Sequence, residues 1–381
     1  MQNSFKVLIC DLVGLNFDEG GKPDPSEVKT HIEAKGGVFH LGLDGAALQG
    51  KINFYYAPDL STREELRALP LFDALIAAAT FIPAECSFPQ GGVRIGAGTG
   101  NMGSHSWGGP SAVGGTAPLM NTPGFNARAT AQMTMKALLH FRPNLPFAEL
   151  HARVAAGSFD TGKNLRDFST AKLEGQTMAV IGYGNIGREV ALLASAFGMK
   201  IKVYARAHHH GRIAADGFVP CLTEQDAAHG ADVISVHTGL GAVDAAGRYS
   251  NAGLINADIL SALHPGATVL NFDRGECVDA AGLSEAMASG QVAHAAIDAD
   301  LFNSDGKLSG PMVPYLPLAE KFGARILLLP HAAADTDHPS RVAGACQAVD
   351  QIFDAILHKR VVNLKGELPQ GYTHGGIKLG V

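Results

Sequence analysis

The sequence predicts an α/β protein with two lobes and mainly parallel sheets. From residue 177 onward, apolar runs typical of buried strands alternate with helical patterns; the strand candidates are TMAVIG, KIKVYA, DVISVH, ATVLNF, HAAIDA and RILLLPH. Apolar runs this dense, joined by helical crossovers, indicate a parallel sheet covered on both faces. The N-terminal part repeats the alternation with KVLIC, DALIAAA and GVRIGAG. The 46 glycines are typical of short connections between strands and helices.

Helices are expected between these strands. PSEVKTHIEAKGG has a Pro-Ser start and a Gly-Gly stop, and helical patterns follow at 129–141, in NIGREVALLASAFG, in AGLSEAMASG and near 339–358. The stretch GTGNMGSHSWGGPSAVGGTAP resembles a flexible linker in composition. However, Trp107 and the following PLMNTPG favour an ordered loop, and VVNL near the end is expected to be extended.

Composition excludes several classes of function. A net charge of −6 and a pI near 6.2 argue against a nucleic-acid partner. The five cysteines are scattered without metal-ligand spacing, which fits reduced thiols and a cytoplasmic protein. MQNSFKVLICDLVG lacks the basic flank of a signal peptide and is interpreted as a first buried strand. No segment approaches the roughly 18 apolar residues that a membrane span needs.

A glycine motif follows the first strand of the second half. It consists of Gly182, Tyr183, Gly184, Asn185, Ile186 and Gly187 and matches GxGxxG, with the strand TMAVI before it and a helical pattern after it. The first glycine permits a tight turn, the second a close approach of a pyrophosphate, and the third close helix–strand packing. The motif therefore predicts dinucleotide binding; the alternative is a structural turn.

The stretch VYARAHHHGR determines which dinucleotide is expected. The fingerprint calls for an acid at the end of the next strand to bind the ribose 2′-hydroxyl, but Ala205 and Arg206 stand there. A small residue followed by arginine removes repulsion of a 2′-phosphate and offers it a bidentate partner. We therefore expect NADP or NAD with NADP favoured, while a solvated loop or a metal site built on His208, His209 and His210 are alternatives. Three adjacent side chains cannot all point at one ion, so no metal is predicted.

Three further segments resemble the D-2-hydroxyacid dehydrogenases, and within them the phosphoglycerate dehydrogenase branch. They are VHTGLG at 236–241, the run from LINADIL to AAIDA at 254–299, and LLLPHAAADT at 327–336. The resemblance implies a Rossmann-type doubly wound domain inserted in a second, flavodoxin-like α/β domain. The expected NAD(P)-binding domain spans 127–333, and the discontinuous substrate-binding domain spans 1–126 plus 334–381. Such enzymes commonly form homodimers.

The resemblance also assigns roles to single residues. Arg274 of NFDRG matches the arginine that binds the substrate's carboxylate and carbonyl, and His331 of LLLPH matches the general acid/base. The guanidinium fork suits a planar 2-oxo acid, and histidine titrates near neutrality. The alternatives are a surface salt bridge and a core histidine. The resemblance places Asp298, His237 and Thr238 beside the cofactor, and Gly98, Thr99 and Asn101 in the substrate-binding loop.

The sequence departs from the family in three places. Asn303 stands where a glutamate usually hydrogen-bonds the catalytic histidine, so it is expected beside His331. Ala77, Ala78 and Ala79 align with a loop that supplies phosphate-binding arginines in one form of phosphoglycerate dehydrogenase, which disfavours a phosphorylated substrate. The sequence ends at GGIKLGV, and serine feedback through a C-terminal regulatory domain is not expected.

These observations support an oxidoreductase that transfers a hydride between a nicotinamide cofactor and a small 2-oxo or 2-hydroxy acid. D-3-phosphoglycerate dehydrogenase is the first alternative, and formate dehydrogenase, which carries an amide at the position of Asn303, is a more distant one. A dinucleotide-sensing binding protein on the same scaffold is the alternative of another class. A sensor needs neither Arg274 nor His331, so turnover of NADPH with a panel of 2-oxo acids discriminates between the two.

Overall fold

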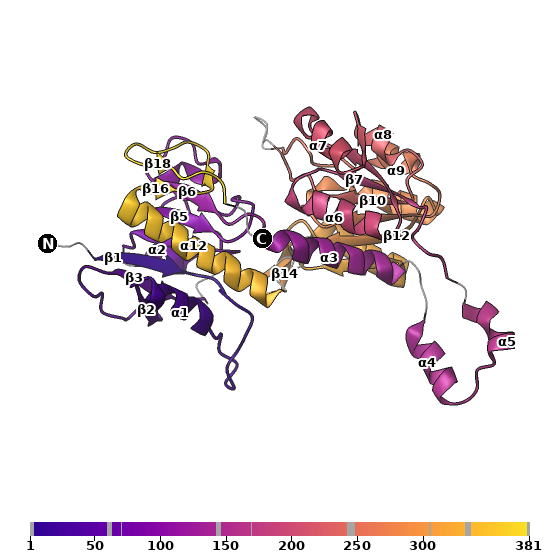
Figure 1. Cartoon of the computed structure of the whole chain (residues 1–381), viewed down its shortest axis with the longest axis horizontal. Helices are drawn as coiled ribbons and strands as arrows, with labels where there is room; N and C mark the ends of the chain where they lie inside the picture. Colours follow the sequence, from indigo (N-terminus) through magenta and orange to yellow (C-terminus); the bar gives the residue numbers. More distant parts are fainter. Residues whose placement is uncertain are drawn as a thin grey trace. The chain divides into compact units, whose positions relative to one another are not determined.

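The computed structural model describes residues 4–58, 63–69, 71–141, 146–168, 170–241, 248–304, 306–331 and 337–378. The chain forms two compact units. Unit 1 comprises Met1–Ala129 and Asp335–Val381, and unit 2 comprises Thr130–Ala334. Unit 2 is thus inserted in the sequence of unit 1 (Figure 1).

Unit 1 is built on a seven-stranded sheet in the order β17-β6-β5-β4-β1-β3-β2. The strands are β1 (Phe5–Ile9), β2 (Val38–Leu41), β3 (Ile52–Tyr56), β4 (Ala74–Ala77), β5 (Gly91–Arg94), β6 (Leu119–Asn121) and β17 (Leu364–Lys365). All neighbours pair in parallel except β17, which is antiparallel to β6. A separate small sheet pairs β16 (Arg360–Val361) with β18 (Thr373–His374).

The two faces of this sheet carry separate apolar cores. Because side chains alternate along a strand, Val7 and Ile9 pack with α1 (Ser26–Ala34) and α12 (His338–His358) on one face. Leu8 and Cys10 pack on the other face with α2 (Arg63–Ala68) and Trp107. Trp107 is 1% exposed and its indole N–H donates to Met102 O at 2.9 Å. The glycine-rich stretch 98–118, with the short 3₁₀ helices His105–Trp107 and Gly109–Ser111, is therefore the ordered loop that the sequence predicts.

Unit 2 is built on a second seven-stranded sheet, in the order β15-β12-β11-β10-β7-β8-β9. The strands are β7 (Thr177–Ile181), β8 (Lys200–Tyr204), β9 (Val219–Cys221), β10 (Val233–Val236), β11 (Ala267–Asn271), β12 (Val292–Asp298) and β15 (Ile326–Leu329). All neighbours are parallel. The first six strands thus have the doubly wound order 3-2-1-4-5-6. An antiparallel hairpin joins β13 (Phe302–Ser304) and β14 (Lys307–Ser309).

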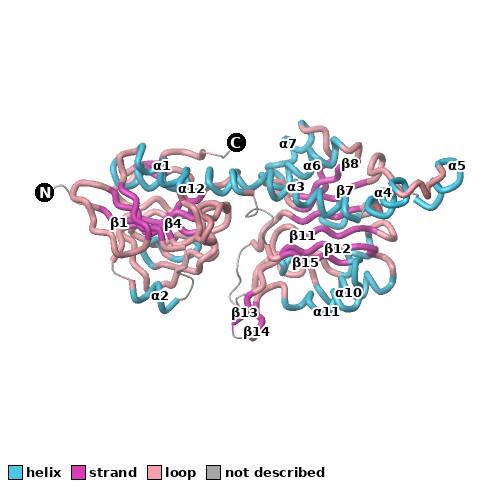
Figure 2. Tube along the Cα trace, turned by 90° about the horizontal axis from the view of Figure 1, so that it is seen from below, coloured by secondary structure: helices cyan, strands magenta, loops and turns pink. Residues whose placement is uncertain are grey.

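Helices cover both faces of this second sheet (Figure 2). Met178 and Val180 pack with α3 (Phe125–Phe141), α6 (Asn185–Ala196) and α7 (His210–Ala215). Ala179 and Ile181 pack on the opposite face with α8 (Glu224–Ala228), α9 (Ala257–Ala262), α10 (Ala280–Ser289) and α11 (Leu316–Phe322). Side chains cap some of the helices; for example, the Asp279 carboxylate accepts the N–H groups of Ala281 and Gly282. The prediction of two α/β domains with parallel sheets, one inserted in the other, is confirmed.

One segment of unit 2 stands out from its sheet. Figure 1 shows α4 (Phe147–Ala155) and α5 (Thr161–Asn164) in an arm that extends from the rest of the unit. Helix α4 has no buried residue, and Phe147 and Val154 are 73% and 56% exposed. Among the described residues, no helix is long and apolar enough to cross a membrane.

Candidate active site

Most of the residues that the sequence singles out in unit 2 lie at one edge of its sheet. Since the strands are parallel, their carboxyl ends meet at the same edge, which is where doubly wound proteins bind ligands. Each of six strands ends at or just before a predicted site residue: β7 before Gly182, β8 before Ala205, β10 before His237, β11 three residues before Arg274, β12 at Asp298 and β15 two residues before His331.

The glycine loop has the geometry that a dinucleotide requires. Gly182 has φ 101°, and a Cβ there would lie 2.2 Å from His237 O. A Cβ at Gly187 would lie 2.2 Å from Gly182 O, so helix α6 packs against the loop only because this residue is glycine. At Gly184, by contrast, a Cβ would meet open space. The first and third glycines are needed for packing, and the second leaves room for phosphates at the start of α6.

A polar network holds the loop to the helices beside it. The Tyr183 hydroxyl donates to Asp216 Oδ2 at 2.7 Å, and Arg188 donates to both oxygens of the same carboxylate, at 2.7 and 2.9 Å. These hydrogen bonds lower the pKa of Asp216 to about 2. No motif in the sequence indicates Asp216, which lies just after α7, 33 residues beyond Tyr183.

The end of β8 lies beside the glycine loop, because Gly182 N donates to Tyr204 O at 2.8 Å. Ala205 is 9% exposed and Arg206 is exposed. His208 and His209 belong to a 3₁₀ turn (Ala207–His209), and His210 Nε2 lies 3.1 Å from Ala205 O. Burial, followed by neighbouring cationic groups, lowers the pKa of His209. Within the described residues, no group of three or more His, Cys, Asp or Glu side chains is arranged to hold a metal ion.

The loop after β10 is tied to the turn that carries Arg274. His237 is buried, with Nε2 2.8 Å from Ser235 Oγ, and burial lowers the pKa of His237 to about 3. The ring is therefore neutral at ordinary pH. In the same loop, Gly239 N–H donates to Asp273 Oδ2. Burial raises the pKa of Asp273, and this hydrogen bond together with the charges of Arg274 and His331 opposes that rise.

Uncharged side chains hold the turn that carries Arg274 through hydrogen bonds to its main-chain oxygens. Asn271, which is 0% exposed, donates from Nδ2 to Arg274 O at 2.9 Å. The Tyr315 hydroxyl lies 2.7 Å from Gly275 O and 2.6 Å from Val278 O. The Arg274 side chain is 34% exposed, and its Nη1 lies 3.7 Å from Asp300 Oδ2. Asp273 and Asp300 are two acids that the sequence analysis did not single out.

His331 follows Pro330 and has φ 55°, a left-handed conformation that is uncommon outside glycine. Its Nδ1 lies 3.0 Å from Asp298 O and 3.8 Å from Asp298 Oδ2. The predicted pairing with Asn303 is not formed in this structure. Asn303 is exposed in the β13–β14 hairpin, where its Oδ1 accepts the N–H of Gly306 at 2.9 Å. The Asn303 side chain, which was expected beside His331, therefore forms its hydrogen bond within the turn of the hairpin.

The other predicted residues lie in unit 1, in the loop after β5. Asn101 donates from Nδ2 to Ala78 O at 3.1 Å and to Thr80 O at 2.8 Å, so it joins this loop to the one after β4. Thr99 Oγ1 donates to Pro110 O at 3.0 Å, and Gly98 is half-buried. The Asp11 carboxylate accepts the N–H groups of Ala78 and Thr80, at 2.7 and 3.2 Å. The Asp11 carboxylate thus supports the loop that follows β4.

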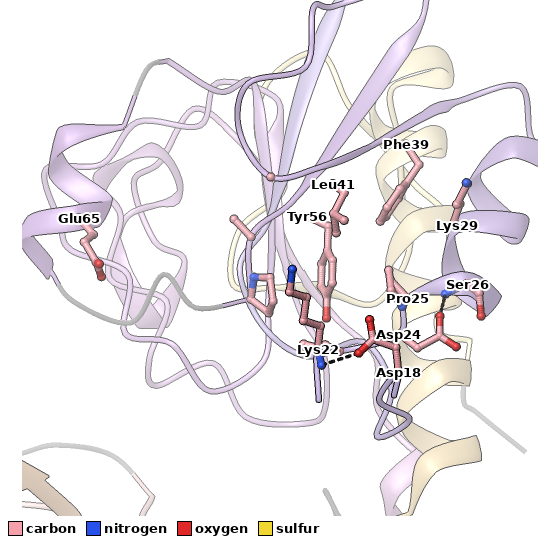
Figure 3. Close-up of a pocket in the computed structure, with 14 residues that line it drawn as sticks. Asp18, Lys22, Asp24, Pro25, Ser26, Lys29, Phe39, Leu41, Tyr56 and Glu65 are labelled. Carbon is pink, nitrogen blue, oxygen red and sulfur yellow. Dashed lines mark hydrogen bonds between the residues drawn. The ribbon is translucent and has the colours of Figure 1, made fainter. Parts of the chain in front are cut away.

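Unit 1 also holds a cavity of about 790 Å³ that contains no predicted site residue. Figure 3 shows Phe39, Leu41 and Tyr56 in it, together with Lys22 and Lys29. Asp18 and Asp24 line it as well, and both accept main-chain N–H groups, those of Lys22 and Ser26 among them. The lining carries both signs of charge, so it favours no single charge class of ligand.

Comparison with known proteins agrees with this geometry. The sequence model of the D-isomer specific 2-hydroxyacid dehydrogenase NAD binding domain matches residues 138–333, half of the chain. D-3-phosphoglycerate dehydrogenase of Rattus norvegicus is 31% identical over 237 residues, which is 61% of this chain and 40% of the relative. Its counterpart in Bacillus subtilis is 28% identical over 218 residues, 57% of this chain and 37% of the relative. The chain therefore matches less than half the length of these curated relatives.

Solved structures show the same fold. D-lactate dehydrogenase from Escherichia coli has a TM-score of 0.62 at 14% identity, covering 96% of this chain and 99% of that one. An NADPH-dependent glyoxylate/hydroxypyruvate reductase from Sinorhizobium meliloti has a TM-score of 0.61 at 20% identity, covering 97% and 99%. Together with the match over residues 138–333, the glycine loop and the arginine and histidine at the carboxyl edge lead to one conclusion: the chain belongs to the D-isomer specific 2-hydroxyacid dehydrogenase family.

Proposed function

We propose that the protein is a dehydrogenase that interconverts a small 2-oxo acid and the corresponding D-2-hydroxy acid with NADP(H) or NAD(H). The observation that carries the proposal is the gathering of the glycine loop, Arg274 and His331 at the carboxyl ends of parallel strands of one sheet. Family membership supports it as well.

Each residue has a chemical role in this proposal. Arg274 binds the carboxylate and carbonyl oxygens of the substrate through the two prongs of its guanidinium. The bound reduced dinucleotide supplies the hydride that the carbonyl carbon receives. His331 delivers the proton to the resulting alkoxide. Asp298 O accepts a hydrogen bond from Nδ1, so the proton for the substrate leaves from Nε2. His237 and Thr238 border the cofactor, and neutral His237 adds no charge there.

The cofactor is proposed to be NADP in preference to NAD. Ala205 offers no acid to repel a 2′-phosphate, and exposed Arg206 follows it directly beside the glycine loop. The S. meliloti neighbour is NADPH-dependent, and a further neighbour of this fold, an acyclic imino acid reductase, was solved in complex with NADPH.

The substrate is proposed to be unphosphorylated. The curated relatives named D-3-phosphoglycerate dehydrogenase favour the alternative of a phosphorylated substrate. Against it, Ala77 at the end of β4 and Ala78 and Ala79 in the loop that follows offer no cation to a phosphate, and the Asp11 carboxylate accepts the N–H groups of Ala78 and Thr80.

The proposal is tested by following the loss of reduced-nicotinamide absorbance with a panel of 2-oxo acids. Turnover that depends on both NADPH and a 2-oxo acid supports the enzyme. Tight NADPH binding without turnover of any 2-oxo acid would instead indicate the dinucleotide-sensing protein.

The assembly is proposed to be a homodimer in the cytoplasm. Phe147, Leu150 and Val154 form a stripe along α4 at helical spacing, and two of them are largely exposed. An uncovered apolar stripe on an arm is typical of a surface that a second copy buries. Free cysteines, five within the described residues, support a reducing compartment.

A further inference from the structure

Three carboxylates surround the two cationic groups of the proposed active site. Asp300 Oδ2 lies 3.7 Å from Arg274 Nη1, and Asp298 Oδ2 lies 3.8 Å from His331 Nδ1. Asp273 is the neighbour of Arg274 in sequence, and its Oδ2 accepts the N–H of Gly239. The Arg274 guanidinium thus already has an ion-pair partner before a substrate binds.

The three acids differ in how accessible their carboxylates are to a substrate. The Asp298 side chain is 4% exposed, which places its charge beneath the surface. Asp273 is engaged with the main chain of the loop after β10. The Asp300 side chain, by contrast, is 36% exposed, and it faces the Arg274 side chain, which is 34% exposed. Asp300 is therefore the carboxylate that a ligand of Arg274 reaches.

This arrangement has opposite consequences for two kinds of substrate. The carboxylate of a 2-oxo acid replaces Asp300 as the partner of Arg274, and one anion is then balanced by one cation. A second anionic group that lies near Asp300 meets its negative charge, and like charges in a partly desolvated site repel. A neutral side chain avoids the penalty, and a cationic one gains an attraction.

We propose that Asp300 is a specificity-determining residue that excludes 2-oxo acids with a second anionic group, phosphorylated ones included. The inference rests on the proposed function and narrows its substrate class to monoanionic 2-oxo acids with neutral or cationic side chains. The order of preference is set by the charge of the side chain rather than by its size.

Two matched pairs of substrates test the proposal. 2-Oxopentanoate and 2-oxoglutarate have the same five-carbon chain and differ by a terminal carboxylate; hydroxypyruvate and 3-phosphohydroxypyruvate differ by a phosphate. The ratio of kcat/KM within each pair measures the penalty for the second anion. We expect the wild type to favour the monoanionic member, chiefly through KM, and the ratio to fall as ionic strength rises.

Variants of Asp300 test whether this residue causes the lower kcat/KM of substrates with a second anionic group. Asp300→Asn keeps the shape of the side chain and removes its charge, and should reduce the ratio on the order of tenfold by raising kcat/KM of the member with the second anionic group. Asp300→Glu, which retains the charge, should keep most of the ratio. Asp258→Asn removes the same charge from an exposed position on α9 and should leave the ratio unchanged.

The outcomes are distinct. If Asp300→Asn lowers kcat/KM of both members equally, Asp300 only holds Arg274 in place and the proposal is overturned. A wild type that reduces the member with the second anionic group as well as its partner also overturns it, while leaving the proposed dehydrogenase function intact. Failure to turn over any member of either pair contradicts the proposed function itself, and the inference with it.

Discussion

His331 Nδ1 lies 3.0 Å from the main-chain oxygen of Asp298, and the carboxylate of the same residue is 3.8 Å from that nitrogen. A carbonyl oxygen can only accept, so Nδ1 carries a proton in every state in which this hydrogen bond persists. Nε2 is then the nitrogen that gains and loses the catalytic proton. The Asp298 carboxylate therefore lies beside the ring that gives up the substrate's proton in reduction.

Asp298→Asn should therefore shift the pH dependence of reduction. The variant keeps the main-chain hydrogen bond and removes the negative charge, so the imidazolium loses its proton at lower pH. The basic limb of kcat/KM should move downward, on the order of one pH unit. The measurement is the pH profile of reduction at saturating NADPH.

Asn303→Glu provides a second shift of the pH profile to compare with that of Asp298→Asn. A carboxylate at this position should move the basic limb upward by on the order of one unit if the β13–β14 hairpin brings it to the ring during turnover. Because Asn303 is hydrogen-bonded to Gly306 in the structure, we expect the shift to be smaller than that of Asp298→Asn. The reverse order would mean that position 303, and not Asp298, is the electrostatic partner of His331.

Arg274→Lys should lower kcat/KM severely and leave NADPH affinity almost unchanged. Lysine keeps the charge but loses the two-pronged donor that matches a 2-oxo acid. The supports of the turn, Asn271 and Tyr315, contact main-chain oxygens and are untouched by the substitution. Steady-state kinetics with a fluorescence titration of NADPH gives both quantities. Undiminished activity of the lysine variant would refute the role of Arg274.

Arg206 and Ala205 should control the choice of dinucleotide. A charge-assisted contact with the 2′-phosphate contributes roughly 1.5–3 kcal/mol, so NADP should be preferred on the order of tenfold to a hundredfold. Arg206→Ala should remove most of this preference, and Ala205→Asp should reverse it by repulsion. The ratio of kcat/KM for the two cofactors is the measurement, and Arg212→Ala tests a second contact. A wild type that prefers NAD contradicts the assignment.

The arm of unit 2 should mediate dimerisation. Phe147 is 73% exposed, so Phe147→Asp places a charge in the proposed interface without disturbing a core. Light scattering after size exclusion should give a dimer for the wild type and a monomer for a Phe147→Asp/Val154→Asp variant. Ala152→Asp, on the opposite face of α4, should remain dimeric. A monomeric wild type at micromolar concentration would contradict the proposal.

The sequence predicted the strands of unit 2 well because their burial makes them continuous apolar runs. The glycine loop and Arg274 could be singled out as candidate site residues because GYGNIG and NFDRG are local motifs. Strand β9 was not predicted: it is three residues long, at the edge of the sheet, and contains Pro220. The partners of the site residues were not predictable either. Asp216, Asp300 and the hairpin position of Asn303 depend on contacts between segments that no local pattern encodes.

The Asp216 network offers a test of how the glycine loop is stabilised. Arg188 and Tyr183 hold the pKa of Asp216 near 2, below the ordinary value of 3.8, so the folded state binds its proton less readily than the unfolded state. The stabilisation is therefore complete above about pH 4 and is lost as the pH falls toward 2. Because the network is partly exposed to solvent, Asp216→Asn should lower the free energy of unfolding by roughly 1 kcal/mol at pH 7. The difference from the wild type should shrink as the pH falls from 4 to 2, whereas exposed Asp258→Asn should have a small effect throughout. Urea unfolding across this range measures both variants. A difference that is independent of pH would mean that Asp216 acts through packing and not through its charge.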